Sequence, residues 1–239
     1  MTAIAGNLQA IRARIDAARR EAGLGSAVDL LAVAKTWPAS AVREAAAAGQ
    51  QAFGENYVQE GVEKVQALRD LALQWHFIGP LQSNKTRAVA EHFDWVHTID
   101  RLRIAQRLSE QRPAALAPLQ LCIQVNVSGE ASKSGVSPEA VHELAHAVAA
   151  LPRLRLRGLM CIPEATENAA LLRSRFAQLR QLRDALNAEG LALDTLSMGM
   201  SHDFETAIAE GASMVRVGTA IFGGRPPKAE SGKEAAVLP

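Results

Sequence analysis

Apolar and polar positions follow two different periods along this chain, and the period changes from one segment to the next. Short apolar runs bounded by glycine, proline or polar residues predict buried strands at residues 29–34, 52–54, 75–79, 95–99, 119–126, 156–162, 194–198 and 214–218. Between these runs, apolar residues recur every three or four positions, which predicts helices. Strands that alternate with helices in this way predict a parallel sheet covered by helices.

The number of predicted strands favours one architecture within this class. Eight parallel strands, each followed by a helix, close a TIM barrel. An open doubly wound sheet is the alternative, but no G-x-G-x-x-G motif follows the first strand. Ile4, Leu8, Ile11 and Ile15 recur at helical spacing before that strand. We therefore expect an α/β fold consisting of a single TIM (β/α)8 barrel with an extra N-terminal helix.

The predicted barrel accounts for most of the chain. The 239 residues match the size of one such barrel, and the composition does not change sharply before residue 224. Residues 225–239 lack apolar periodicity and are rich in proline, lysine and glutamate. We expect one domain over residues 1–224 and a disordered C-terminal tail over 225–239.

Composition narrows the classes of partner. The formal net charge of +1 argues against binding to nucleic acid or to an anionic membrane surface. Cys122 and Cys161 each lie in an apolar stretch, which favours buried reduced thiols. No apolar stretch approaches 18 residues, and the N-terminus lacks the pattern of a secretion signal. The chain is predicted to be soluble and cytoplasmic.

The first predicted strand ends in a lysine. Lys35 closes the apolar run 29–34 and precedes Thr36-Trp37-Pro38. Chemistry in a TIM barrel takes place at the C-terminal ends of the strands. A partly desolvated lysine there shifts toward its neutral form, which attacks an aldehyde to form a Schiff base. On this segment alone, a solvated lysine just beyond a strand is the simpler interpretation.

The ends of the last two predicted strands are suited to an anion. Ser201 follows the seventh strand and is expected to start a helix that Gly211 ends, and a helix N-terminus binds phosphate. Gly218 and Thr219 follow the eighth strand and offer backbone N–H groups and a hydroxyl. TIM barrels often bind phosphate at these two loops. The alternatives are an ordinary helix cap at Ser201 and an ordinary turn at Gly218.

Three charged residues lie near these loops: one needs a partner, and two should point away from a bound phosphate. Arg216 lies inside the apolar eighth strand and stays ionised, so it requires either a structural ion pair or a ligand such as a ring nitrogen. Asp203 and Glu205 would repel a phosphate at Ser201, so their side chains are expected to point away from it.

Seven segments of the chain resemble the pyridoxal phosphate homeostasis protein family, and together they extend over nearly the whole sequence up to Gly224. These segments are residues 32–36 (AVAKT), 53–60 (FGENYVQE), 75–85 (WHFIGPLQSNK), 132–135 (SKSG), 158–160 (GLM), 196–201 (LSMGMS) and 215–223 (VRVGTAIFG). The resemblance implies a barrel like the N-terminal domain of alanine racemase, with pyridoxal 5′-phosphate (PLP) held as a Schiff base on Lys35.

The resemblance also implies roles for residues around the cofactor. Ser201, Gly218 and Thr219 would hold the phosphate. Arg216 would face the pyridine nitrogen, and Asn56 would lie beside the cofactor. His76 is a further residue that is expected near it.

Members of this family have no established catalytic reaction and are thought to buffer and deliver PLP. The resemblance therefore implies a PLP carrier or regulator in place of an enzyme, with apo PLP-dependent enzymes as its recipients. A single domain without an evident swapped element favours a monomer.

A PLP-dependent racemase or decarboxylase is the alternative function. A racemase needs a second acid or base opposite the lysine, and Tyr57 is the one tyrosine in the chain. The sequence after the barrel is too short for a second domain, and Tyr57 is better explained as a packing residue at a helix start. Lys133 lies on the rim after the fifth strand and is open to two interpretations, a transient second PLP acceptor or a solvated loop lysine.

A more remote alternative is a zinc hydrolase. His142-Glu143-Leu144-Ala145-His146 matches the H-E-x-x-H motif, with Glu164 as a candidate third ligand. The apolar stripe of this helix is expected to pack against the outside of the barrel, which would leave both histidines far from the phosphate rim. We therefore expect no metal site.

Overall fold

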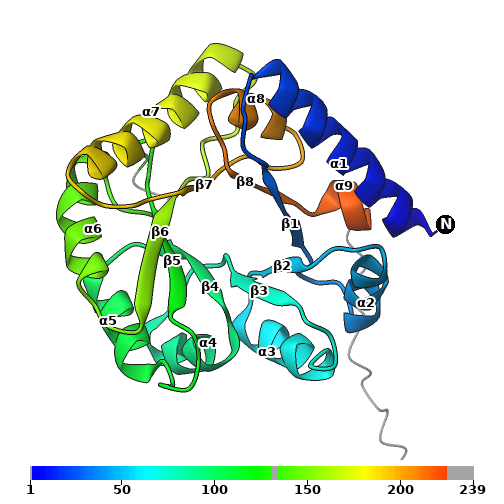
Figure 1. The fold of residues 1–239 in the computed structure, drawn as a ribbon, viewed down its shortest axis with the longest axis horizontal. Helices are drawn as coiled ribbons and strands as arrows, with labels where there is room; N and C mark the ends of the chain where they lie inside the picture. Colours follow the sequence, from blue (N-terminus) through cyan, green and yellow to red (C-terminus); the bar gives the residue numbers. More distant parts are fainter. Residues whose placement is uncertain (1, 131–133, 225–239) are drawn as a thin grey trace, which may run out of the picture.

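The computed structural model describes residues 2–130 and 134–224, and within them the sheet closes into a barrel (Figure 1). Each strand is parallel to its neighbours in the order β1 to β8, and β8 pairs with β1 to close the ring. The strands are β1 (Asp29–Val33), β2 (Ala52–Glu55), β3 (Gln74–Phe77), β4 (Trp95–Ile99), β5 (Leu119–Gln124), β6 (Leu154–Met160), β7 (Thr195–Ser197) and β8 (Met214–Val217). The predicted TIM barrel is confirmed.

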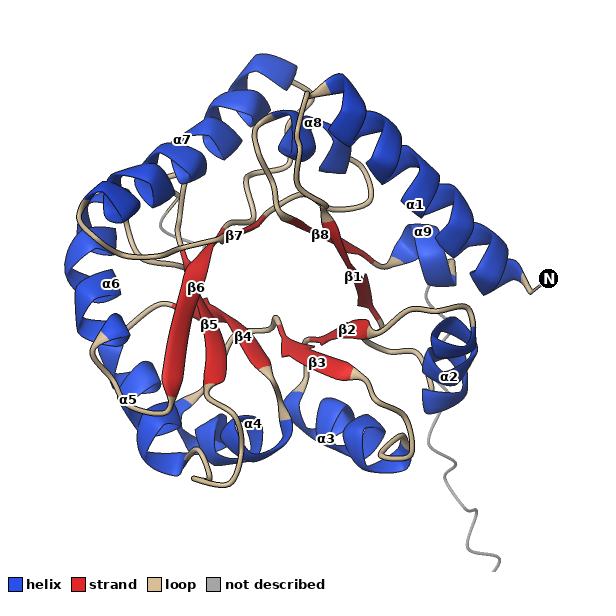
Figure 2. Cartoon of the chain, in the orientation of Figure 1, coloured by secondary structure: helices blue, strands red, loops and turns tan. Residues whose placement is uncertain are grey.

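Helices surround the ring of strands on its outer side (Figure 2). They are α1 (Ala3–Glu21), α2 (Ala39–Ala47), α3 (Val58–Ala67), α4 (Thr86–His92), α5 (Leu102–Gln111), α6 (Val141–Ala149), α7 (Ala169–Ala188), α8 (Phe204–Ala209) and α9 (Thr219–Phe222). Helix α1 is the predicted extra helix. Its buried stripe, which includes Leu8, Ile11 and Ile15, packs it beside α8 and α9 (Figure 1).

Most strands differ from the sequence prediction by one or two residues at one or both ends, and pairing with a neighbour explains two of these boundaries. Strand β6 begins two residues early, since Leu154 and Arg155 pair with the start of β5. Strand β5 stops at Gln124, and the N–H of Asn126 donates instead to the carbonyl of Val136. Hydrophobicity predicted the strands, but the ladder decided where each one starts and stops.

Side chains alternate between the lumen of the barrel and the layer under the helices. In β1, Ala32 packs in the large core between sheet and helices, whereas Leu31 packs in a separate cluster with Ile78, which follows β3, and Met214 of β8. Because successive strand residues point to opposite faces, Lys35 continues the lumen-facing series of Leu31. The same phase in β8 brings Arg216 to the lumen after Met214.

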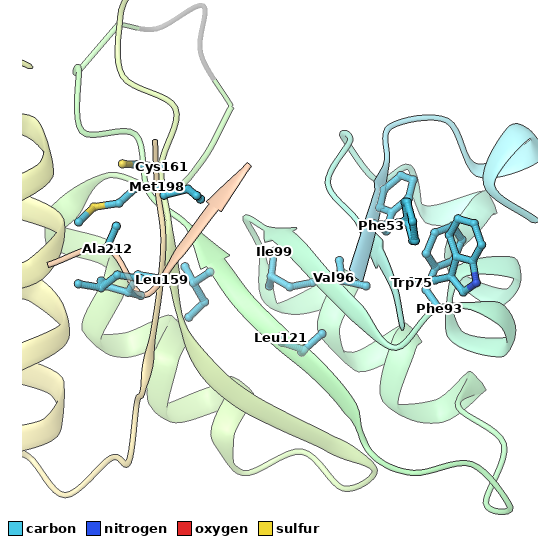
Figure 3. Close-up of a cluster of buried hydrophobic side chains, with 14 of the residues drawn as sticks. Phe53, Trp75, Phe93, Val96, Ile99, Leu121, Leu159, Cys161, Met198 and Ala212 are labelled. Carbon is cyan, nitrogen blue, oxygen red and sulfur yellow. The ribbon is translucent and has the colours of Figure 1, made fainter. Parts of the chain in front are cut away.

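The main core lies between the strands and the surrounding helices. Figure 3 shows the aromatic side chains of Phe53, Trp75 and Phe93 grouped together at one side of this core. Phe53 and Trp75 lie with ring centroids 5.9 Å apart, so an aromatic pair connects β2 to β3. This packing holds the strand ends that carry Glu55 and Asn56.

Two predictions fall partly or wholly beyond the described residues. The tail expected over 225–239 and the loop residue Lys133 are both outside them. Within residues 2–130 and 134–224, no helix has the length and apolar character needed to cross a membrane.

Candidate functional site

A cavity of about 240 Å³ opens at the C-terminal ends of the strands. Its lining includes all six residues that the sequence analysis assigned to the site: Lys35, Asn56, Ser201, Arg216, Gly218 and Thr219. Val33, Ile78, Ile162, Met200 and His202 complete the lining. The fold therefore brings together residues from β1, β2, β7 and β8, while the role of each residue stays a prediction.

The backbone at Lys35 is held on both sides by side chains of α3. The Nζ of Lys64 donates to the carbonyl of Ala34 at 2.7 Å, and the N–H of Thr36 donates to Oε1 of Glu60 at 2.5 Å. Thr36 has a φ of 68°, a left-handed conformation that a β-branched residue rarely adopts. The two peptide groups that flank Lys35 are thus fixed from outside the barrel, which orients its side chain toward the cavity.

Lys64 and Glu60 belong to a buried charged cluster with Glu55. Lys64 Nζ lies 2.7 Å from Glu55 Oε1 and 2.6 Å from Glu60 Oε1, and Lys64 and Glu55 are both buried. Burial raises the pKa of Glu55 to about 7, although the nearby ammonium of Lys64 opposes this shift. The other oxygen of Glu55, Oε2, has no hydrogen-bond partner among the described residues. We refer to Glu55, Glu60 and Lys64 as the lysine clamp.

The segment around Ser201 differs in detail from the sequence prediction. Ser201 does not cap a helix, because α8 starts later, at Phe204, with Asp203 at the cap position. Asp203 accepts the N–H of Met200 at 2.5 Å, which closes a turn in which Ser201 lies. Gly199 has a φ of 90°, and a Cβ there would lie 2.7 Å from the side chain of Ala207. This turn, and not a helix N-terminus, presents Ser201 to the cavity.

The loop after β8 is also packed more tightly than an ordinary turn. Gly218 precedes α9, and Thr219 is its first residue, so the N–H of Thr219 lies in the first turn where intrahelical acceptors are lacking. A Cβ on Gly218 would lie 3.1 Å from the carbonyl of Val33. A side chain at this position would press on the end of β1 beside Lys35, so a glycine suits the close approach of β8 to β1.

The charge of the cavity suits a phosphate ester. Lys35 and Arg216 line it, and none of the described lining residues is Asp or Glu. As expected from the sequence, Glu205 points elsewhere, pairing with Arg14 of α1 at 2.5 Å. Asp203 is engaged in the turn at Met200. The lining thus combines a lysine amine, a guanidinium and backbone turns that suit an anion, so the residues fit PLP.

Arg216 is almost fully buried, and its partners are neutral. Its NH1 donates to the carbonyl and the hydroxyl of Ser197 at 2.6 and 2.8 Å, and its NH2 donates to the carbonyl of Cys161 at 2.9 Å. The described residues do not form the structural ion pair that the sequence left open. Burial lowers the pKa of Arg216, but an arginine stays ionised in proteins.

Two residues that the sequence considered lie away from the cavity. His76 is fully buried, bonds to His97 and Gln74 and does not line the cavity. The reason is its place in the middle of β3, below the strand end. Tyr57 is 58% exposed, just before α3, and does not line the cavity.

The H-E-x-x-H helix does not assemble a zinc site within the described residues. His142 and His146 each lie 2.8 Å from Glu189 on the outer surface, and Glu164 bonds instead to Ser128 and Arg175. No group of three metal-ligating side chains occurs in residues 2–130 and 134–224.

Sequence reasoning missed the lysine clamp. In α3, Lys64 occupies what reads as a polar position between the apolar residues Val62 and Val65. Two signals were present: the spacing of Glu60 and Lys64 by four residues, which makes a helical ion pair, and a carboxylate, Glu55, at the end of an apolar strand.

Comparison with known proteins places this geometry in a family. Residues 6–226 match the family model "Alanine racemase, N-terminal domain". The chain is 62% identical over 226 residues to the pyridoxal phosphate homeostasis protein of Pseudomonas aeruginosa, with 94% of this chain and 97% of the relative covered. It is 57% identical over 232 residues to the Escherichia coli K12 protein of the same name, with 94% and 98% covered.

Solved structures agree with this relationship. PipY from Synechococcus elongatus PCC7942, solved with PLP bound, is 40% identical, covers 92% of this chain and 100% of its own, and has a TM-score of 0.81. Alanine racemase from Corynebacterium glutamicum shares the fold, with 20% identity, a TM-score of 0.69, and coverage of 92% of this chain and 60% of that one. The fold and the site thus define a barrel of the alanine racemase N-terminal type. Within that type, the chain belongs to the pyridoxal phosphate homeostasis protein family.

Proposed function

We propose that this protein binds PLP as a Schiff base on Lys35 and acts in intracellular PLP homeostasis by buffering or delivering the cofactor. The observation that carries the proposal is the meeting of Lys35, Arg216 and the Ser201 and Thr219 loops around one cavity. A 40% identical relative solved with PLP bound supports the choice of ligand. Residues 1–224 would act as one binding domain.

Each group in the cavity has a distinct task in this proposal. PLP supplies an aldehyde that combines with an amine. Lys35 provides that amine from a backbone fixed by the lysine clamp. Ser201, Gly218 and Thr219 hold the phosphate, and Asn56 lies beside the ring. Arg216 would face the ring nitrogen, where its permanent charge would keep that nitrogen unprotonated and weaken the ring as an electron sink.

The same features favour a carrier over a racemase or decarboxylase. An unprotonated ring stabilises carbanions poorly, and Tyr57 does not reach the cavity to act as a second acid or base. Ile162 and Met200 line the cavity and are exposed, so its mouth is accessible from solvent. An accessible cofactor suits exchange with apo PLP-dependent enzymes. The proposed setting is a cytoplasmic monomer with no nucleic-acid or membrane partner.

The test is the near-ultraviolet and visible spectrum of the purified protein with added PLP, before and after borohydride. The wild type is expected to show a yellow band that borohydride removes, leaving PLP fixed to the peptide that contains Lys35. The variant Lys35→Ala is expected to lose the band, while Lys85→Ala, which changes an exposed lysine, keeps it. A wild-type protein that stays colourless with PLP, or a label on another lysine, would refute the proposal.

A further inference from the structure

A chain of hydrogen bonds runs through the lumen of the barrel and ends at Arg216. Arg216 NH1 donates to Ser197 Oγ at 2.8 Å, and Ser197 Oγ lies 2.8 Å from His97 Nδ1. His97 Nε2 lies 2.9 Å from His76 Nδ1, and His76 Nε2 lies 3.0 Å from Gln74 Oε1. Four successive contacts thus connect the candidate cofactor cavity to the first residue of β3.

This chain crosses the barrel from one wall to the other. His97 belongs to β4 and Ser197 to β7, and β5 and β6 separate these two strands in the sheet. His76, His97 and Ser197 have no exposed surface. Trp95 stacks on His76 with ring centroids 5.2 Å apart, which fixes the plane of that imidazole. The contact between His97 of β4 and Ser197 of β7 is therefore buried, and stacking on Trp95 restrains the imidazole of His76 beside it.

The Gln74 end sets the direction of the hydrogen bonds, because Ser197 Oγ has two lone pairs and could by itself accept from both Arg216 and His97. A guanidinium can only donate, and a side-chain amide oxygen can only accept. Ser197 accepts from Arg216 and donates its hydroxyl hydrogen to His97 Nδ1. His97 then donates through Nε2 to His76 Nδ1, and His76 donates through Nε2 to Gln74 Oε1. The reverse direction would set an unprotonated His76 Nε2 against Gln74 Oε1 at 3.0 Å, where two acceptors repel each other.

Both imidazoles are neutral in this environment. Burial lowers the pKa of His76 to about 3, and burial with the nearby charge of Arg216 lowers the pKa of His97 well below its usual value. A neutral imidazole has one donor and one acceptor nitrogen, so each ring transmits the direction that Gln74 Oε1 sets. The hydrogen-bond chain therefore turns the negative end of the Ser197 hydroxyl dipole toward Arg216 without neutralising the charge of the guanidinium.

The hydrogen-bond chain contacts the guanidinium of Arg216, and the same side chain lines the cavity. Its guanidinium has five N–H donors, and three of them are taken by Ser197 and Cys161. The side chain also lines the cavity. Its position toward a ligand therefore depends on the groups that hold it from behind, and Ser197 holds it from the lumen.

We propose that His97 and His76 are positioning residues for Arg216, acting through Ser197 to aim the guanidinium at the bound cofactor. This inference rests on the proposed function, since it takes PLP as the ligand that Arg216 meets. It assigns a role to the lumen histidines, which do not touch the cavity. His97 orients the hydroxyl of Ser197, and His76 orients the ring of His97.

The first test reads the proton positions in the wild-type protein without PLP. Long-range ¹H–¹⁵N correlation spectra of the imidazole rings are expected to show His76 and His97 as neutral Nε2–H tautomers from pH 8 to 5. An Nδ1–H tautomer for either ring, or protonation of either ring in this range, would overturn the inference. This result does not depend on whether any variant folds.

The second test compares variants at His97 by PLP titration. His97→Leu cannot accept from Ser197 or donate to His76, and it is expected to weaken PLP affinity by about 10-fold, the scale of a lost hydrogen bond to a charged network. His97→Gln offers an amide oxygen and an N–H for the same two contacts and is expected to stay within about 3-fold of the wild type. Met160→Leu, which changes another buried lumen residue outside the chain, serves as the packing control.

The outcomes separate this inference from the proposed function. A wild type that binds PLP beside a His97→Leu variant of unchanged affinity would overturn the positioning role and leave the function intact. Equal loss in His97→Leu, His97→Gln and Met160→Leu would point to general packing and would also overturn it. A wild type that does not bind PLP would refute the function, and the inference would fall with it.

Discussion

The two cationic residues of the cavity are held in opposite ways. The backbone at Lys35 is fixed from outside the barrel, where the charged side chains of Lys64 and Glu60 form hydrogen bonds with the peptide groups on either side of it. Arg216 is held from inside, where neutral groups of Ser197 and Cys161 contact the guanidinium itself. One cation is positioned through its backbone and the other through its head group.

The difference matches what each residue does in the proposed function. Lys35 would react through its side chain, and Lys64 and Glu60 contact the peptide groups that flank it. A guanidinium that only recognises its ligand can be held directly. Neutral partners leave its charge undiminished for that ligand, whereas a carboxylate partner would neutralise it. Charged side chains thus position Lys35, and neutral hydrogen-bonding groups position Arg216 in the same site.

The largest expected effect comes from removing the cation of the lysine clamp. Lys64→Met leaves Glu55 buried without its partner and frees the carbonyl of Ala34. Breaking a buried ion pair from one side costs on the order of 3–5 kcal/mol of stability. Urea denaturation at pH 8, where Glu55 is ionised, should show a loss of this size together with slower formation of the Lys35 Schiff base.

The matched control for this variant is Lys85→Met, which alters an exposed lysine. Its stability is expected to stay within about 0.5 kcal/mol of the wild type. If Lys64→Met also stayed in that range, the clamp would not be the support that its geometry indicates.

The second effect is a difference in sign between the pH dependence of stability that comes from Glu55 of the lysine clamp and the one that comes from His76 in the lumen. Burial raises the pKa of Glu55 from 4.5 to about 7, so between these values the folded state holds a proton that the unfolded state has lost. Its contribution to stability therefore falls as pH rises through this window. Burial lowers the pKa of His76 from 6.5 to about 3, so its contribution is complete above pH 6.5 and falls as pH drops below it.

Glu55→Gln tests this contrast because it removes one slope and leaves the other. Relative to the wild type, the variant should gain on the order of 2–3 kcal/mol of stability as pH rises from 4.5 to 7. Urea denaturation at several pH values measures the difference, and His76→Gln should change it in the opposite direction. A constant difference between Glu55→Gln and wild type across this range would contradict the raised pKa.

The smallest expected effect concerns a charged group on the surface. His146 lies 2.8 Å from Glu189, and both side chains are exposed. His146→Ala should change stability by less than about 1 kcal/mol, since exposed ion pairs contribute little, and it should leave PLP affinity unchanged. PLP titration of this variant, with Glu143→Ala as its neighbour control, checks both points; a loss of PLP affinity would mean that α6 communicates with the cavity.

Much of the site was predictable from strand ends and from the family resemblance. Lys35 follows the end of β1 and Arg216 lies near the end of β8, so their place at one rim follows from the barrel itself. The helix predicted from Ser201 was wrong because Asp203 takes the N–H of Met200 and delays α8 to Phe204. The later start of α8 depends on a local hydrogen bond that the apolar pattern does not encode.

The sequence by itself determined the order of strands and helices, the closed barrel and the rim on which the chemistry is expected. These follow from periodicity, which is a local property of the chain. Only the tertiary structure decided that Lys64 reaches the carbonyl of Ala34 and that His97 meets Ser197, 100 positions away, across the lumen. Such contacts depend on the register at which eight strands close, because a shift of one residue would turn the strand side chains of His97 and Ser197 to the opposite face.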